Sequence, residues 1–94
     1  MTMEEFRKRI VNSSCSYKFL GSEDGFWIGA DEEWLIEEMS TEYKKNCIKY
    51  LEKHSQNIET GFFLKGVKYN KNEKDELIRL GRIAMQNKTN ELSE

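Results

Sequence analysis

Cys47 and His54 carry the side chains most suited to nucleophilic or metal chemistry, and both fall on one expected helix. A thiol nucleophile needs its base within hydrogen-bonding distance, whereas seven residues along a helix separate this pair by about 10 Å. A closed zinc site needs four ligands, and neither a Cys-x-x-Cys nor a His-x3-His spacing is present. We therefore interpret Cys47 as a buried core thiol and His54 as a helix-end residue, and we expect no metal site.

Carboxylates are concentrated between Glu23 and Glu42, a segment with eight acidic residues and no lysine or arginine. Neighbouring carboxylates such as Glu37 and Glu38 point in different directions on a strand or a helix, so they are poorly placed to act as an acid and base pair. The spacings of an EF-hand loop and of a phosphate-binding loop are both absent. We expect a protein that is not an enzyme and that needs no cofactor.

The segment from Lys44 to Lys71 reverses this balance, with seven lysines against two glutamates. Aromatic residues lie among these lysines, as in sites that stack a base and bind its phosphates. One hypothesis is therefore an oligomeric protein that sequesters a small anionic signalling nucleotide. Its candidate residues are Lys44, Lys49, Tyr50, Phe62, Phe63, Lys65, Lys68 and Tyr69. We do not expect nucleic acid as a partner, because a domain that binds it is usually basic and the isoelectric point here is near 5.5.

The acidic segment suggests another kind of partner, a protein with a basic surface. Trp27 and Trp34 flank its expected turn, and tryptophan is a common anchor of protein interfaces. Packing in the core is the alternative for both indoles, and attraction between two solvated faces is the alternative for the charges. The candidate partner-binding residues are Trp27, Asp31, Glu32, Glu33 and Trp34.

Helices are expected at both ends of the chain. Thr2 begins a capping-box pattern, and the apolar spacing after it predicts a helix over residues 2–11. Either Asn70 or Asn72 predicts the N-cap of a last helix. The expected inner face of this last helix consists of Leu77, Leu80, Gly81, Ala84 and Met85. The final residues, 87–94, are expected to fray.

Between these helices the pattern predicts a hairpin. Residues 16–20 alternate as an extended segment, with Tyr17 and Phe19 on one side. The glycines and the aspartate of residues 21–25 predict a turn, which leads into a strand over residues 26–28.

Residues 29–39 fit two structures. In the first, residues 29–33 form a turn and residues 34–39 form a third strand, which would place Trp34 and Ile36 on one face. In the second, Asp31 caps a short helix. We favour the strand because tryptophan, leucine and isoleucine suit a pleated surface.

A central amphipathic helix is expected from Ser40, as N-cap, to His54. Its apolar face, which is expected to pack on the sheet, consists of Tyr43, Cys47, Tyr50, Leu51 and His54. Residues 61–69 fit either a strand or a loop, because two glycines weaken any regular pattern.

The chain therefore predicts one small α+β domain over residues 1–94, with a short antiparallel sheet of two or three strands packed by an N-terminal, a central and a C-terminal helix. No apolar run is long enough to span a bilayer, and the first residues lack the apolar core of a signal peptide, so we expect a cytoplasmic protein without a membrane partner. A domain of this size gains stability from association, which makes a homo-oligomer a reasonable expectation.

The block WIGADEEWLIEEMSTEYKKNCIKYLEK resembles small accessory proteins encoded by bacteriophages and prophages. In those proteins a tryptophan-bearing hairpin leads into a helix with methionine, a short polar cap, an aromatic residue or histidine, asparagine and leucine. The matching positions are Trp27, Met39, Tyr43, Asn46 and Leu51, which span less than a third of the chain. The resemblance implies a protein without enzymatic activity that binds and inhibits a host protein, as in countering antiviral defence, or sequesters a signalling nucleotide inside an infected or lysogenic bacterium.

Overall fold

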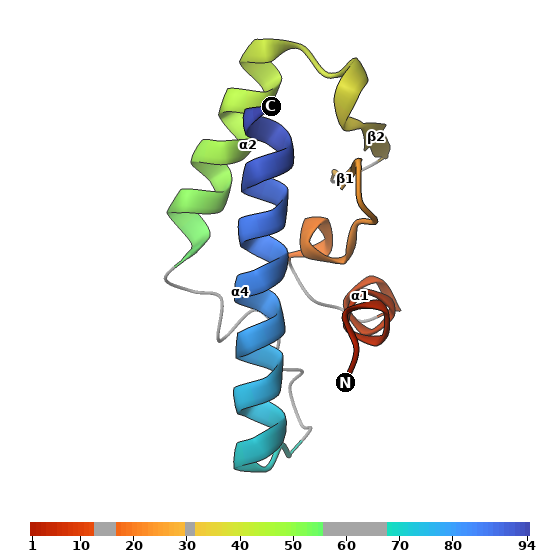
Figure 1. Ribbon diagram of the computed structural model, residues 1–94, viewed down its shortest axis with the longest axis vertical. Helices are drawn as coiled ribbons and strands as arrows, with labels where there is room; N and C mark the ends of the chain where they lie inside the picture. The colour runs from red at the N-terminus through yellow and green to blue at the C-terminus, as the bar shows by residue number, and fades with distance from the viewer. Residues whose placement is uncertain (13–16, 30–31, 56–67) are drawn as a thin grey trace.

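Three α-helices and one β-hairpin make up the regular structure in the part of the chain that the computed structural model describes, residues 1–12, 17–29, 32–55 and 68–94 (Figure 1). In chain order the elements are α1 (Met3–Asn12), the 3-10 helix η1 (Lys18–Gly21), β1 (Phe26–Ile28), β2 (Glu33–Leu35), the 3-10 helix η2 (Ile36–Glu38), α2 (Thr41–His54) and α4 (Lys71–Ser93). This arrangement confirms the expected α+β class.

Helix α1 begins with the predicted capping box. The Thr2 hydroxyl accepts a hydrogen bond from the Glu5 amide at 3.2 Å, and the Glu5 carboxylate accepts one from the Thr2 amide at 3.3 Å. These bonds satisfy amide groups that have no partner inside the helix. One turn apart, Phe6 and Ile10 point inward and are buried.

The extended segment expected over residues 16–20 is wrong for the part that the structure describes, because Lys18–Gly21 form the 3-10 helix η1. Phe19 and Leu20 are consecutive and both buried, whereas a strand with one solvent face buries alternate residues. The Ser22 hydroxyl fixes the turn by donating to the Phe19 carbonyl at 2.7 Å and accepting from the Ile28 amide at 2.8 Å. Gly21 lies so close to α1 that an added Cβ would sit 2.8 Å from a Val11 methyl carbon.

Of the two expected hairpins, the second, between residues 26–28 and the strand after residue 33, is present with a shorter second strand. Strands β1 and β2 pair antiparallel with Trp27 directly opposite Trp34. Residues 30–31 of the turn predicted over residues 29–33 lie outside the described residues, and Glu33 belongs to β2. The chain leaves the sheet after Leu35, although we expected the strand to continue to residue 39. Ile36 and Met39 explain the change, because both are buried and a 3-10 turn places residues three apart on one side.

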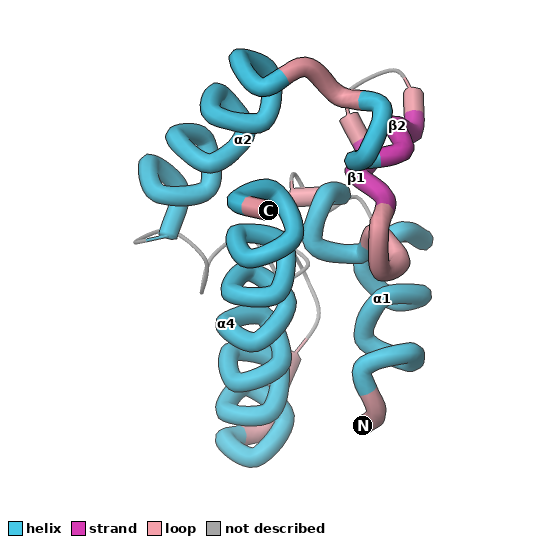
Figure 2. Tube along the Cα trace, turned by 45° about the horizontal axis from the view of Figure 1, so that its top comes forward, coloured by secondary structure: helices cyan, strands magenta, loops and turns pink. Residues whose placement is uncertain are grey.

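The Ser40 hydroxyl caps α2 by accepting from the Tyr43 amide at 3.1 Å, as predicted. The chain passes over the C-terminal end of α4 to reach α2, which then runs antiparallel to α4 (Figures 1 and 2). Cys47 and Leu51 are buried in the core. Helix α2 packs along α4. Of the face that we expected to lie on the sheet, Tyr43 meets Trp34 of the hairpin and Tyr50 meets Phe19 of η1.

Helix α4 begins at Asn70, whose side chain accepts from the Glu73 amide at 2.8 Å in a second capping box. It continues to Ser93 and so includes most of residues 87–94, which we expected to fray. Lys88 and Leu92 are both buried, and their contacts hold the last turns in place. At about 1.5 Å per residue, its 23 residues span about 34 Å, most of the 41 Å long dimension of the molecule.

Candidate binding site: an aromatic groove beside an acidic hairpin

A groove of about 570 Å³ lies where α2, β1 and η1 meet. Helix α2 contributes one wall, because Tyr43, Asn46 and Tyr50 recur at the three-to-four-residue spacing of a single helical face. We call it the aromatic groove, and its described lining residues are Lys18, Phe19, Trp27, Ile28, Gly29, Tyr43, Asn46, Cys47 and Tyr50.

The rings of the aromatic groove hold one another in place. Trp27 stacks on Phe19 with 4.9 Å between the ring centroids and 10° between the planes, and Tyr50 meets Phe19 edge-on at 5.3 Å. Trp27 is only 4% exposed and lies at the base, whereas Tyr50 is 40% exposed and forms the outer wall. On the other side of Tyr50, the His54 ring lies 4.3 Å away. A rigid aromatic wall is therefore available to a ligand without loss of rotamer freedom.

Burial raises the pKa of two titratable side chains that line the aromatic groove, Cys47 and Tyr43. It raises the pKa of the Cys47 thiol to about 11, which removes the nucleophilic thiolate and agrees with a structural role for this residue. Burial also raises the pKa of the Tyr43 hydroxyl, with smaller contributions from Cys47 and from the Glu32 carboxylate. The Glu32 carbonyl accepts from the Gly29 amide at 2.8 Å, so Glu32 lies next to a residue that lines the aromatic groove.

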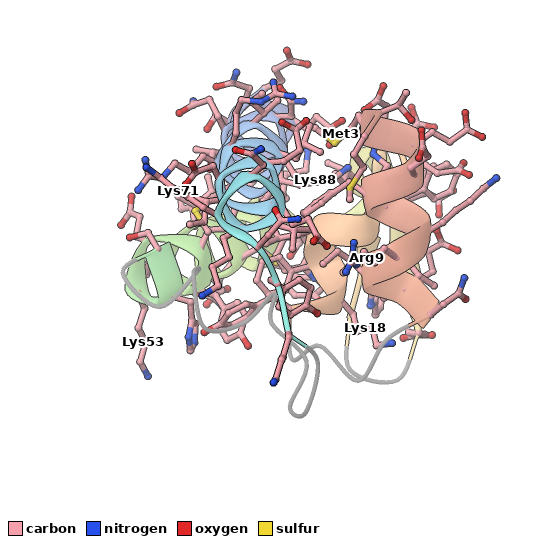
Figure 3. All side chains as sticks on the ribbon, turned by 90° about the horizontal axis from the view of Figure 1, so that it is seen from below. Met3, Arg9, Lys18, Lys53, Lys71 and Lys88 are labelled. Atoms are coloured by element: carbon pink, nitrogen blue, oxygen red, sulfur yellow. The ribbon has the colours of Figure 1, made fainter. Side chains whose placement is uncertain are left out.

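Lys18 is the cation among the described lining residues. Its ammonium donates to the Val11 carbonyl at the C-terminal end of α1, at 2.5 Å, and Figure 3 shows it in that position. This bond pairs the ammonium with the negative end of the α1 dipole. Lys18 therefore already has a partner of opposite partial charge.

The hairpin and the residues that follow it carry a group of exposed carboxylates, which we call the acidic surface: Glu32, Glu33, Glu37, Glu38 and Glu42. Among the described residues, no cation lies within ion-pairing distance of any of the five. Trp34 lies between them in the chain, is 36% exposed and meets Tyr43 edge-on at 5.4 Å between centroids. Tyr43 therefore joins the acidic surface to the aromatic groove.

A buried ion pair fixes the start of the hairpin on α4. The Lys88 ammonium donates to the Glu91 carboxylate and to the Glu23 carbonyl, both at 2.7 Å. The other Glu91 oxygen accepts from the Gly25 amide at 3.1 Å. Gly25 has a φ of +85°, which side chains with a Cβ rarely adopt. Figure 3 shows Lys88 on the side of α4 that faces α1.

The predicted partner-binding residues that the structure describes fall into two groups, one at the surface and one in the core. Glu32, Glu33 and Trp34 lie at the surface of the hairpin, whereas Trp27 belongs to the core and leaves little area for a partner. Asp31 lies outside the described residues.

The predicted nucleotide-binding residues that the structure describes do not converge on one site. Only Tyr50 lines the aromatic groove, and Lys44 lines a different cleft beside Glu37 and Glu91. Lys49 and Lys68 are exposed elsewhere, and Tyr69 lies beneath the Arg9 guanidinium, 5.4 Å from its ring centre. Phe62, Phe63 and Lys65 lie outside the described residues.

Of the described lining residues, only Trp27 and Tyr50 were predicted as binding residues. Sequence reasoning missed Lys18, Phe19, Ile28, Gly29, Tyr43, Asn46 and Cys47. The helical spacing of Tyr43, Asn46 and Tyr50 was a usable signal for one wall. The opposite wall depends on how η1 and β1 pack, which no local spacing reveals.

Over residues 1–12, 17–29, 32–55 and 68–94, no group of three or more His, Cys, Asp or Glu side chains is placed to hold a metal ion. Within the same residues, none of the helices combines the length and the apolar character needed to cross a membrane. Comparison with known proteins finds no matching family model, no similar curated protein and no similar solved structure.

Proposed function

We propose that this protein has no enzymatic activity and binds another protein, whose basic surface contacts the acidic surface and Trp34. The observation that carries the proposal is the arrangement around Trp34, where five exposed carboxylates without a described ion-pair partner accompany a half-exposed indole. Unpaired charge of one sign attracts a partner of the opposite sign and speeds association. An indole held by Tyr43 supplies apolar contact area at low entropic cost.

The biological setting of the proposal comes from the resemblance of residues 27–53 to phage and prophage accessory proteins. Such a protein acts stoichiometrically, by covering a functional surface of a bacterial host protein. A basic surface suits this role, because host proteins that handle nucleic acid or nucleotides expose lysine and arginine.

Photocrosslinking tests the proposal at the residue that carries it. Trp34 is replaced by p-benzoylphenylalanine, and Ile83, which is 39% exposed on α4, is replaced in a matched control. In bacterial lysate we expect the Trp34 position to crosslink a discrete protein with a basic surface and the Ile83 position not to do so. The same crosslinked product from both positions, or none from Trp34, would contradict the proposal.

A second candidate function is the sequestration of a small anionic nucleotide. It is supported by the aromatic groove, whose stacked rings, Asn46 amide and Lys18 ammonium suit a planar base with an attached phosphate. Calorimetry with cyclic and ADP-ribose-derived nucleotides tests it, with heat of binding that disappears in Tyr50→Ala as the expected result. An absence of heat across the panel would rule this candidate out.

A further inference from the structure

We propose that the aromatic groove binds an arginine side chain of the basic partner. This inference rests on the proposed function and names the anchor that the partner inserts beside Trp34. It assigns to Tyr43, Asn46 and Tyr50 a role in recognition that goes beyond the attraction of the acidic surface.

The shape and chemistry of the aromatic groove match the two parts of an arginine side chain. Its base of Phe19 and Trp27 is apolar and flat, and the exposed wall is the ring of Tyr50. A guanidinium group is planar, weakly hydrated and attracted to the negative face of an aromatic ring. The alkyl part of the side chain finds apolar contact with Ile28.

The charges around the aromatic groove favour a cation over an anion. Glu32 borders the aromatic groove, because its carbonyl accepts at 2.8 Å from the amide of Gly29, a lining residue. The Lys18 ammonium keeps its positive charge, but it is directed to the Val11 carbonyl at the C-terminal end of α1. The exposed Asn46 amide oxygen is a further acceptor for a guanidinium N–H.

Lysine satisfies these features less well than arginine. Its ammonium is a compact, strongly hydrated charge, so burying it between rings costs more desolvation free energy. The planar guanidinium stacks on Tyr50 and still donates at its edge to the Asn46 amide oxygen. The aromatic groove therefore distinguishes arginine from lysine, which the acidic surface alone does not.

An NMR titration tests this inference with N-acetyl-arginine-N-methylamide as the probe. We expect saturable shifts of the Trp27 indole N–H and of the Asn46 side-chain amide, with a dissociation constant on the order of millimolar. The matching citrulline compound has nearly the same shape without the charge, and we expect it to cause little shift. Equal shifts with citrulline, or none with arginine, would overturn the inference, as would shifts caused by AMP and not by arginine.

Variants of Tyr50 supply the matched controls. Because Tyr50 is 40% exposed, its replacement leaves the core intact. We expect Tyr50→Ala to weaken arginine binding about tenfold and Tyr50→Phe, which keeps the ring, to bind almost as wild type. Unchanged affinity in Tyr50→Ala would exclude the stacking role.

An octalysine peptide separates the failure of this inference from the failure of the proposed function. It measures attraction to the acidic surface without arginine. If octalysine binds and the arginine compound does not, the inference falls and the proposed function stands. If the combined variant Glu33→Gln, Glu37→Gln and Glu38→Gln binds octalysine as wild type, the acidic surface itself is excluded.

Discussion

At the scale of single residues, Trp27 and Trp34 show how packing gives one residue type two roles. They are directly opposed in the hairpin, yet Trp27 is 4% exposed and Trp34 is 36% exposed. Phe19 stacks on the first indole, whereas the second meets only the edge of Tyr43 in the described rings. One tryptophan therefore stabilises the core, and the other remains available at the surface.

Because of Cys47, we expect the protein to lose stability at alkaline pH. Its pKa of about 11 exceeds its ordinary value of 9.0, so the folded state holds the thiol proton more tightly than the unfolded state. This contribution to stability is complete below about pH 9 and is lost as the pH rises through 11. We expect the free energy of unfolding to fall by as much as about 3 kcal/mol from this group.

The measurement is urea denaturation between pH 8 and 11 for wild type and Cys47→Val. The difference between the two isolates the thiol from Tyr43, whose pKa is also raised. A pH profile of the variant parallel to that of wild type would contradict the prediction.

Substitution of Lys88 tests the contribution of its ion pair with Glu91 to stability. We expect Lys88→Ala to lower the free energy of unfolding by about 3 kcal/mol or more, because it leaves the partly buried Glu91 carboxylate without its cation. Adding Glu91→Gln to Lys88→Met removes both charges and keeps an acceptor for the Gly25 amide. Urea denaturation is expected to show a smaller loss for this double variant than for Lys88→Ala, and an equal loss would argue against the charge explanation.

At the scale of elements, the starts of the helices follow from local sequence because a cap joins residues three apart. Thr2, Ser40 and Asn70 each accept from the amide three residues later. The strands are less local, since β2 ends after Leu35, where Ile36 and Met39 turn inward. Burial therefore decided where the sheet stops.

The choice between Asn70 and Asn72 as the cap of α4 gives a matched pair of variants. We expect Asn70→Ala to destabilise the protein by about 1 kcal/mol, because it removes the acceptor of the Glu73 amide. Asn72→Ala, in the first turn of the helix, is expected to change stability by less than about 0.5 kcal/mol. Thermal denaturation of both variants checks this, and the opposite order would assign the cap to Asn72.

The C-terminal turns of α4 also make a testable contribution. We expect Leu92→Ala to cost about 2 to 4 kcal/mol, since the side chain is 3% exposed within the core. Glu94→Ala, beyond the helix, serves as the control. A fraying tail would instead make both changes neutral in urea denaturation.

At the scale of the whole molecule, a net charge of -2 conceals an uneven distribution. The acidic surface gathers five carboxylates near the hairpin, while Lys88 and Arg7 neutralise Glu91 and Asp24 close by. Long-range attraction of the proposed basic partner would therefore depend on one side of the molecule and be screened by salt.

Salt dependence of octalysine binding measures this field. We expect the affinity to fall severalfold between 50 and 250 mM NaCl, because the Debye length shortens below about 10 Å. The combined variant Glu33→Gln, Glu37→Gln and Glu38→Gln is expected to bind more weakly at low salt and to lose most of this dependence. Fluorescence anisotropy with a labelled peptide gives both curves, and an affinity that is independent of salt would contradict an electrostatic surface.

The sequence by itself determined the α+β class, the N-caps of α1 and α2 and the segregation of charge, because each depends on residues within a few positions of one another. It narrowed the N-cap of α4 to Asn70 or Asn72, and it contains the helical spacing of Tyr43, Asn46 and Tyr50, from which no site was predicted. Tertiary structure alone decided the rest. The turn at η1 brings Phe19 onto Trp27, α2 packs along α4, and Lys88 ties the start of the hairpin to α4. Burial is a property of the assembled chain, so only the packed molecule distinguishes the core tryptophan from the exposed one.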